Sequence, residues 1–160
     1  MKFTSIDIKN PQTYNIIIGR SHFIKTVEDI YEAIVNTVPG ARFAIAFNEA
    51  SSKRLIRFEG NDEELISLAC DNAKLIKAGH TFVIFLKDAY PVNLLKTLRS
   101  VPEVVEILVA TANPLRLILA EEEERAAIIG IMDGYTPLGI ENEEDKKERR
   151  QFLRNIGYKF

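Results

Sequence analysis

The chain has 160 residues, of which 46% are apolar and 28% are charged, proportions typical of a soluble globular protein with one domain. The formal net charge of −2 argues against a protein that binds duplex nucleic acid, and the single cysteine, Cys70, excludes an internal disulfide. No apolar run is long enough to cross a membrane and residues 1–15 lack the pattern of a secretory signal, so we expect a cytoplasmic protein.

Two strands and a helix are predicted near the N-terminus. Residues 2–8 and 13–18 have the composition of strands, and the turn signal Asn10-Pro11 separates them. From residue 26 to about residue 38 the apolar side chains recur at helical spacing, with Thr26 as a suitable N-cap. This helix is expected to pack through Val27, Ile30, Tyr31, Ile34, Val35 and Val38.

A hairpin and a second helix follow. The stretch RFAIAFNEASSKRLIRFEG contains two strand candidates around a polar loop, so we expect a hairpin with residues 48–52 at its tip. Asn61 can cap a helix that ends at Gly79. The segment HTFVIFL has the composition of a buried strand, and Pro91 is placed to open a short helix.

The last third of the chain is predicted to add three strands, at residues 103–110, 115–120 and 126–132, and a charged helix at residues 142–156. We expect this helix to dock through Phe152, Leu153 and Ile156. Strands outnumber helices and often follow one another directly. That order favours an α+β fold, with a mixed or largely antiparallel sheet and flanking helices, over a doubly wound parallel sheet. We assign residues 1–160 to a single domain.

A corner that could bind an anion follows the second predicted strand. In the segment GRSHFIKT, Lys25 and Thr26 occupy the last two positions of a G-x-x-x-x-G-K-[ST] motif, but Ile24 replaces the second glycine of that motif. Because a β-branched residue resists the backbone conformations that this loop needs, we reject a Walker loop. The free N–H groups at a helix start could still bind one phosphate, helped by Arg20, Ser21, Lys25 and Thr26.

His22 lies in the same corner. It could be a general base, a donor to a phosphate, or a nucleophile that accepts a phosphoryl group, since imidazole exchanges protons near neutral pH. It could also satisfy local backbone groups only, and this is the more frequent role. His80 starts a buried strand without a charged neighbour in the sequence, and we interpret it as structural.

Three more polar positions are candidates. Glu49, next to Asn48 in the hairpin tip, could bind a ribose hydroxyl pair or a metal, although a solvated carboxylate is more common there. Asn113 could recognise a purine edge or only start a turn. Asp133 could activate a hydroxyl or bind Mg²⁺, yet Asp-Gly is also a standard turn signal. No HExxH, GxSxG, CxxC or GxGxxG motif occurs.

Several blocks of the chain resemble the family called adenosine-specific kinase, small proteins mostly from archaea and thermophilic bacteria. They are GRSHFIKTVEDIYEAI, FAIAFNEAS, GNDEELISLA, AGHTFVIF, PVNLLKTLRSVPEV, LVATANPLRLILAE and GIMDGYTPLGIE, and they span nearly the whole chain. Abundant Ile, Glu, Lys and Arg without Trp also suit a thermophile. The family pattern has a cysteine where this chain has Asn48, so chemistry that needs a thiol there cannot carry over.

The resemblance implies an adenosine or AMP ligand, phosphoryl transfer and a homo-oligomer, with a trimer as the first candidate. It also implies roles for the candidate residues. We expect catalysis by His22, Lys25 and Asp133, and substrate contacts from Arg20, Ser21, Thr26, Asn48, Glu49 and Asn113.

The resemblance leads to two functional hypotheses, an enzyme and a binding module, and a structural protein without a ligand is the third hypothesis. In an adenosine-directed phosphotransferase, Asp133 or Glu49 would orient the acceptor hydroxyl, while Arg20 and Lys25 would offset charge on the moving phosphoryl group. His22 would carry that group covalently if the chain has no ATP cradle. We expect no protein-bound metal, only Mg²⁺ that accompanies a nucleotide donor. The alternatives are a nucleoside or AMP binding module without turnover, and a structural oligomer whose polar corners are only turns.

Overall fold

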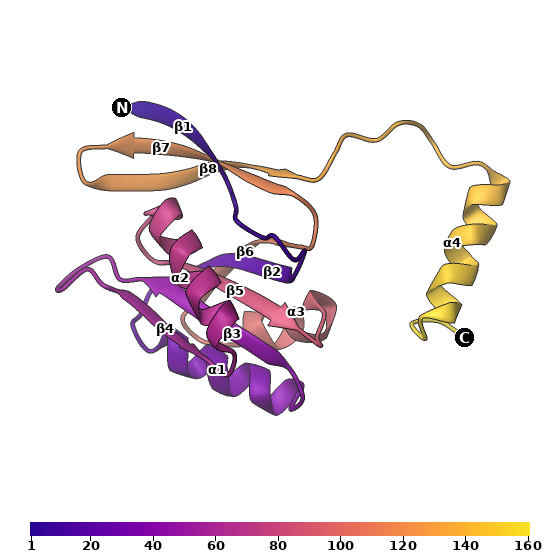
Figure 1. Ribbon diagram of the computed structural model, residues 1–160, viewed down its shortest axis with the longest axis horizontal. Helices are drawn as coiled ribbons and strands as arrows, with labels where there is room; N and C mark the ends of the chain where they lie inside the picture. The colour runs from indigo at the N-terminus through magenta and orange to yellow at the C-terminus, as the bar shows by residue number, and fades with distance from the viewer.

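The computed structural model describes all 160 residues and confirms an α+β fold with eight strands and four helices (Figure 1). The elements follow one another in the predicted order, with small shifts at their ends. The strands are β1 (Lys2–Asp7), β2 (Asn15–Ser21), β3 (Arg42–Asn48), β4 (Ile56–Gly60), β5 (Thr81–Lys87), β6 (Val104–Thr111), β7 (Leu115–Glu122) and β8 (Arg125–Asp133). The helices are α1 (Thr26–Thr37), α2 (Glu63–Ile76), α3 (Pro91–Arg99) and α4 (Glu143–Asn155).

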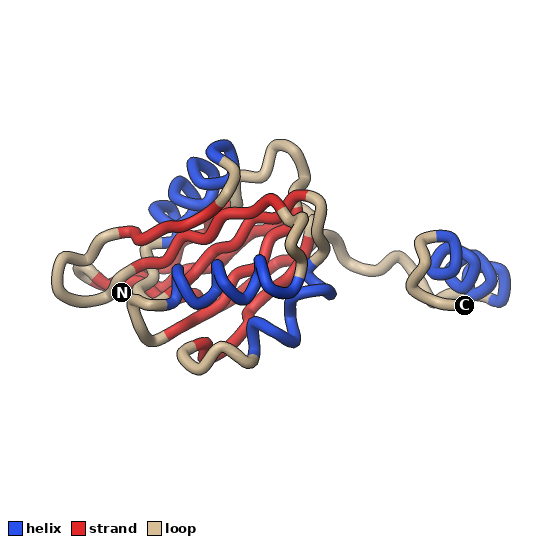
Figure 2. The backbone as a smooth tube through the Cα atoms, turned by 90° about the horizontal axis from the view of Figure 1, so that it is seen from below, coloured by secondary structure: helices blue, strands red, loops and turns tan.

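A five-stranded antiparallel sheet with the order β4-β3-β5-β2-β6 forms the centre of the body. Its strands β2, β3 and β5 are almost continuous apolar runs because both faces of the sheet are covered. Helices α1 and α3 cover one face, which Figure 2 shows, and α2 covers the other. The core on the α1 side includes Ile17, Ile30, Phe43, Phe82 and Leu94.

A three-stranded antiparallel sheet with the order β1-β7-β8 lies on the same side of the central sheet as α2. Along β7, Leu115, Leu117 and Leu119 are buried, whereas Arg116 between them is exposed. The three leucines belong to the core that α2 and the central sheet also build. The alternation of strand side chains therefore fixes which face of this small sheet is buried.

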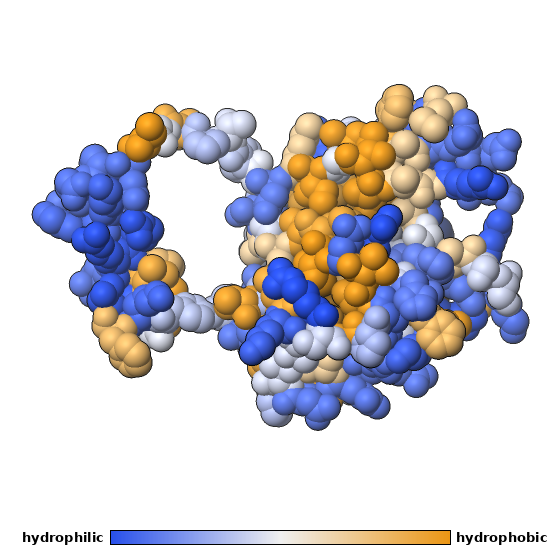
Figure 3. All heavy atoms as spheres, turned by 180° about the vertical axis from the view of Figure 1, so that it is seen from behind, coloured by the Kyte–Doolittle hydropathy of each residue, from blue (hydrophilic) through white to orange (hydrophobic).

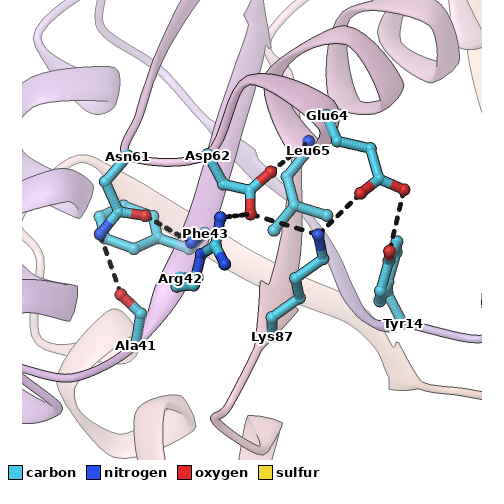
Figure 4. Close-up of polar contacts among 9 residues, drawn as sticks. All are labelled: Tyr14, Ala41, Arg42, Phe43, Asn61, Asp62, Glu64, Leu65 and Lys87. Carbon is cyan, nitrogen blue, oxygen red and sulfur yellow. Dashed lines mark hydrogen bonds and ion pairs between the residues drawn. The ribbon is translucent and has the colours of Figure 1, made fainter.

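The start of α2 differs from the prediction by one residue. Asp62, and not Asn61, is the N-cap, and its carboxylate accepts a hydrogen bond from the Leu65 N–H at 3.1 Å. Asn61 instead donates to the Ala41 carbonyl at 2.9 Å and accepts from the Phe43 N–H at 2.8 Å (Figure 4). Because the Asn61 amide already joins these two backbone groups, the next residue caps the helix.

Residues 134–160, which we call the arm, leave the body as an extended segment that ends in α4 (Figure 1). None of the α4 residues is buried, and the predicted docking stripe is uncovered, with Phe152 59% and Ile156 46% exposed. The prediction that this helix docks on its own chain is therefore wrong. No helix of the chain has the length and apolar character needed to cross a membrane.

Candidate functional site

Most of the predicted site residues lie at one end of the central sheet. β2 ends there at Ser21 and β3 at Asn48, and β5 begins there just after His80. The His80 N–H donates to the Asn48 carbonyl at 2.7 Å, and the Ser21 N–H donates to the His80 carbonyl at 2.9 Å. The anion corner and the hairpin tip are therefore about 10 Å apart, two strand spacings across the sheet.

The two cations of the corner are already paired. The Arg20 guanidinium contacts the Glu106 carboxylate at 2.6 Å. The Lys25 ammonium contacts Asp29 at 2.6 Å and Glu103 at 3.4 Å. The hydrogen bond to Asp29 and the nearby Glu103 carboxylate raise the pKa of Lys25, so this side chain stays charged. A phosphate at this corner would have to compete with carboxylates for both cations.

The hydroxyl groups of the corner are also engaged. The Ser21 and Thr26 hydroxyls lie 2.5 Å apart, and both residues are buried. Ser21 donates to the Glu103 carbonyl at 3.0 Å, and Thr26 hydrogen-bonds the Phe23 carbonyl. Thr26 is the first residue of α1 and not its N-cap, which is Lys25. Within this chain, these two hydroxyls hold the turn together.

His22 has a fixed backbone and an exposed side chain. Its N–H donates to the Glu103 carbonyl at 3.1 Å, and its imidazole stacks beside the Phe23 ring with 6.2 Å between centroids. The imidazole makes no hydrogen bond within the chain. It is therefore reachable by a ligand at the surface, as a nucleophile or a donor must be.

A cavity of about 520 Å³ lies beside this corner. Lys25 lines it, but His22 does not. The other wall comes from the end of the hairpin loop and from β4, so the cavity joins the corner to the hairpin. Its lining is Phe23, Ile24, Lys25, Val27, Glu28, Leu55, Ile56, Arg57, Phe58 and Glu59.

A larger cavity of about 680 Å³ lies on the other side of the hairpin loop and shares Leu55 and Ile56 with the first. Its volume falls in the range typical of small-molecule sites. The C-terminal end of α2 and the turn between β7 and β8 complete its wall. The lining is Asn48, Glu49, Ala50, Arg54, Leu55, Ile56, Ala73, Lys74, Lys77, Gly79, Glu123, Glu124, Arg125 and Ala126.

Glu49 is held rigidly in the wall of the larger cavity. Its Oε2 atom accepts from the Leu55 N–H at 3.0 Å and from the Arg57 guanidinium at 3.1 Å. The Leu55 hydrogen bond and the Arg57 charge hold the pKa of Glu49 below its usual value, so it is a carboxylate at neutral pH. Its Oε1 atom makes no hydrogen bond within the chain, and the side chain is 10% exposed. One oxygen of a fixed carboxylate is thus available to a ligand.

Asn48 lines the same cavity, but its amide nitrogen is occupied. It donates to the Ala73 carbonyl at 3.0 Å and to the Ala78 carbonyl at 3.1 Å. These bonds satisfy carbonyl groups at and just beyond the end of α2, which stops at Ile76 and not at Gly79. The side chain therefore anchors the helix end beside the cavity.

Strained backbone gathers around the larger cavity. Arg54, Lys77 and Glu123 line it and have φ angles of 51°, 58° and 53°. His80, whose ring stacks on Phe47, has a φ of 62° and directly follows Gly79, another residue of the lining. Residues other than glycine seldom adopt this left-handed backbone conformation, and residues that do so often cluster at binding and catalytic sites. Lys77 is the C-cap of α2, and Glu123 lies in the tight turn between β7 and β8, so local turns account for these two conformations.

Asn113 and Asp133 lie at the opposite end of the sheet. The Asp133 carboxylate accepts from the Thr111 hydroxyl at 2.6 Å and from the Asn113 amide at 3.1 Å. Thr111 pairs with Ile16 at the start of β2, whereas the corner follows Ser21 at its end. The five residue-to-residue steps from Ile16 to Ser21 span about 17 Å. Within one chain, Asp133 therefore cannot act together with His22.

The structure also reveals polar residues that the sequence analysis did not select. Glu103 is 1% exposed, and its carboxylate oxygens make no hydrogen bond; the Lys25 ammonium contacts one of them at 3.4 Å. It was missed because nothing in the block PVNLLKTLRSVPEV indicates that its glutamate is buried, and charged residues are seldom fully buried. Lys74 and Arg125 line the larger cavity and form no ion pair, so both cations are free for an anionic ligand. No group of three or more His, Cys, Asp or Glu side chains is placed to hold a metal ion.

Comparison with known proteins identifies a family and a similar structure. The sequence model of the family described as "Adenosine specific kinase" matches residues 6–159. The crystal structure of the PH1918 protein from Pyrococcus horikoshii OT3 is similar to this chain, with 46% sequence identity and a TM-score of 0.94. The match covers 99% of this chain and 98% of that one. No curated protein matches the sequence.

Proposed function

Because the chain belongs to the adenosine specific kinase family, we propose that it is an adenosine-directed phosphotransferase that binds its nucleoside in the larger cavity. The observation that carries this proposal is the fixed carboxylate of Glu49 at that cavity, with one oxygen free of partners. A carboxylate in this state can accept a hydrogen bond from a ribose hydroxyl and take up its proton during transfer. Adenosine and ATP occur in the cytoplasm, where we place the reaction.

The cavity has groups for each part of a nucleotide. Leu55 and Ile56 offer an apolar wall to the base, next to Glu49 for the ribose. The unpaired cations Lys74 and Arg125 can offset charge on the moving phosphoryl group. Mg²⁺ would arrive with a nucleotide donor and neutralise further phosphate charge.

His22 would take part if the phosphoryl group is transferred in two steps. Its imidazole nitrogen would attack the terminal phosphorus of the donor, and the bond from that phosphorus to the bridging oxygen would break. The ribose hydroxyl would then attack the phosphohistidine, while Glu49 takes the hydroxyl proton. Lys25, in the wall of the neighbouring cavity, would stabilise the transferred group.

The direct test is an assay with adenosine, labelled ATP and Mg²⁺ that detects AMP and acid-labile label on the protein. Glu49→Gln should keep the Leu55 hydrogen bond and lower the turnover number about 10²–10⁴-fold, the usual contribution of a general base. Glu123→Gln removes the same charge from the rim of the same cavity and serves as the matched control. Equal turnover of both variants would refute the role of Glu49.

The two-step route has its own test. His22→Ala should abolish the acid-labile label and AMP formation while adenosine affinity persists, because the imidazole does not line either cavity. AMP formation by this variant at the normal rate would leave direct transfer as the mechanism. No AMP and no label from the unaltered protein, beside an active control kinase, would rule out catalysis.

A second candidate, an AMP-binding module without turnover, is favoured by two observations. Arg20 and Lys25 are both paired with carboxylates, and no glycine-rich loop offers a triphosphate cradle. Calorimetry separates the two candidates, because the module should bind AMP without competition from ATP. For either function we also expect a homo-oligomer, with a trimer as the first candidate.

A further inference from the structure

Glu103 lies in the turn between α3 and β6, directly before the first residue of β6. Glu103 and Asp62 are the two charged residues that are buried. All other charged residues are at least partly exposed, and Figure 3 shows hydrophilic residues over much of the outside of the molecule. Because transfer of a carboxylate out of water is costly, a buried carboxylate needs compensating contacts.

The two buried carboxylates differ in how well they are compensated. Asp62 accepts a hydrogen bond from the Leu65 N–H and contacts two cations, at 2.8 Å and 3.2 Å. Glu103 makes no hydrogen bond through either carboxylate oxygen, and its one ion pair is the contact with Lys25 at 3.4 Å. Unsatisfied buried polar groups are rare in native proteins, and those that occur often have a functional role. The carboxylate of Glu103 is therefore a poor source of stability and a candidate for function.

The other buried polar atoms without a partner lie at the same end of the central sheet. They are the hydroxyl of Thr81, at the start of β5, and the Nε atom of Arg57, near the start of β4. At this end β2 leads into the corner that contains His22. The buried side-chain atoms that lack a hydrogen bond thus all lie beside the candidate site.

Glu103 contacts both functional groups of the corner. Its carbonyl oxygen accepts from the His22 N–H at 3.1 Å and from the Ser21 hydroxyl at 3.0 Å. Its carboxylate contacts the Lys25 ammonium. The second partner of this ammonium, Asp29, is partly exposed, so water competes with that ion pair. The buried carboxylate is the partner that stays in a fixed place.

We propose that Glu103 is a positioning residue, which holds the Lys25 ammonium in place for a phosphoryl group that is transferred to His22. A lysine side chain has a flexible stem, so its charge has to be fixed before it can act at one point. This inference rests on the proposed transfer through His22 and deepens it, because it names the residue that orients Lys25.

The test labels the full-length chain with phosphoramidate, a small phosphoryl donor that needs no nucleotide site. The His22 imidazole nitrogen attacks the phosphorus, the phosphorus–nitrogen bond of the donor breaks and ammonia leaves, while the imidazole releases its ring proton to solvent. Glu103→Gln should lower the rate constant of labelling about 10–100-fold, the size expected when a charge moves by about 1 Å. Glu32→Gln, which removes an exposed charge from α1, should leave the rate unchanged.

Two outcomes of the labelling would overturn the proposal. One is a normal rate in the Glu103→Gln variant. The other is an unaltered chain that carries no acid-labile label at His22, with the His22→Ala variant as the blank.

A double-mutant cycle shows whether Glu103 acts through Lys25. Lys25→Met should slow the labelling of His22 by itself. Addition of Glu103→Gln to that variant should slow it no further, because the group that the carboxylate orients is then absent. Losses that multiply in the double variant would contradict a positioning role.

Urea unfolding separates positioning from a role in stability. Because Glu103→Gln replaces a poorly paired buried charge with a neutral group, its unfolding midpoint should equal or exceed that of the unaltered chain. A lower midpoint would assign Glu103 to the fold and overturn the proposal. The assay with adenosine and ATP is independent of these measurements. A chain that phosphoramidate labels at His22 but that forms no AMP would refute the kinase and leave the role of Glu103 intact.

Discussion

Substitutions of Asp62 should distinguish the stability that comes from its helix cap from the stability that comes from its buried charge. The Asp62 side chain is 3% exposed, and it caps α2 while it contacts Arg42 at 2.8 Å and Lys87 at 3.2 Å (Figure 4). Burial by itself raises the pKa of the Asp62 carboxyl, but the Leu65 N–H and the two cations outweigh it and hold that pKa below its ordinary value. The carboxylate therefore stabilises the fold at neutral pH.

Two substitutions divide this contribution. Asp62→Asn keeps an oxygen that can cap the helix but removes the charge, so the free energy of unfolding at pH 7 should fall by about 1–2 kcal/mol, near the lower end for a hydrogen bond to a charged group. The loss stays small because Lys87 keeps its contact with Glu64 at 2.8 Å and Arg42 can be hydrated. Asp62→Ala also removes the cap and should cost about 1 kcal/mol more.

The assay is urea unfolding of the unaltered chain and both variants between pH 7 and pH 3. Because the folded-state pKa of Asp62 lies below the unfolded-state value near ~3.9, the stabilisation is complete above that value and is lost as the pH falls through the folded-state pKa. The difference between the unaltered chain and Asp62→Asn should therefore shrink in acid. Asp71→Asn, an exposed control on the same helix, should change stability by less than about 0.5 kcal/mol. A difference for Asp62→Asn that is the same at pH 7 and pH 3 would refute the reasoning.

Two further substitutions test a close approach of the backbone at Gly19 and a buried hydrogen-bonding amide at Asn72. Gly19→Ala places a Cβ atom 2.4 Å from the Phe82 ring and 2.5 Å from the Glu106 carbonyl, so we expect a loss of about 2–3 kcal/mol in urea unfolding, and an unchanged midpoint would contradict this close approach. Asn72→Ala removes the amide that donates to the Lys9 carbonyl at 2.9 Å and accepts from the Lys9 N–H at 2.8 Å. Thermal unfolding should show a loss of about 2–3 kcal/mol, and a normal transition would mean that water replaces the amide.

Sequence patterns predicted the body well because its elements follow simple periodicities. The runs in β2, β3 and β5 and the helical spacing in α1 reflect burial directly. Local competition for hydrogen bonds set the start of α2: Asn61 and Asp62 are both good caps, and only the position of the Ala41 and Phe43 backbone groups decides between them. The stripe of α4 was read correctly as apolar, but an apolar stripe in a sequence does not tell whether the body of the same chain covers it, and here the body does not.

The candidate site was predictable only in part. The corner and the hairpin do meet at one end of the sheet, because β2 and β3 both end there. Asp133 was grouped with His22 because both lie in blocks that resemble the family, and strand direction places it at the other end of the sheet. Lys74 and Arg125 were missed because free cations on a helix and a strand look like ordinary surface residues until a cavity is seen between them.

Because β1 pairs with β7, the N-terminal strand cannot join its sheet until most of the chain has been synthesised. β1 leaves the exit tunnel first, yet every one of its backbone partners belongs to residues 116–121. At about 5–20 residues per second, the first strand waits on the order of 6–25 s for them. Until then the leucine face of the small sheet is missing and α2 has no cover on that side. A nascent chain of this protein should accordingly be a better client for chaperones before the synthesis of β7 than after it.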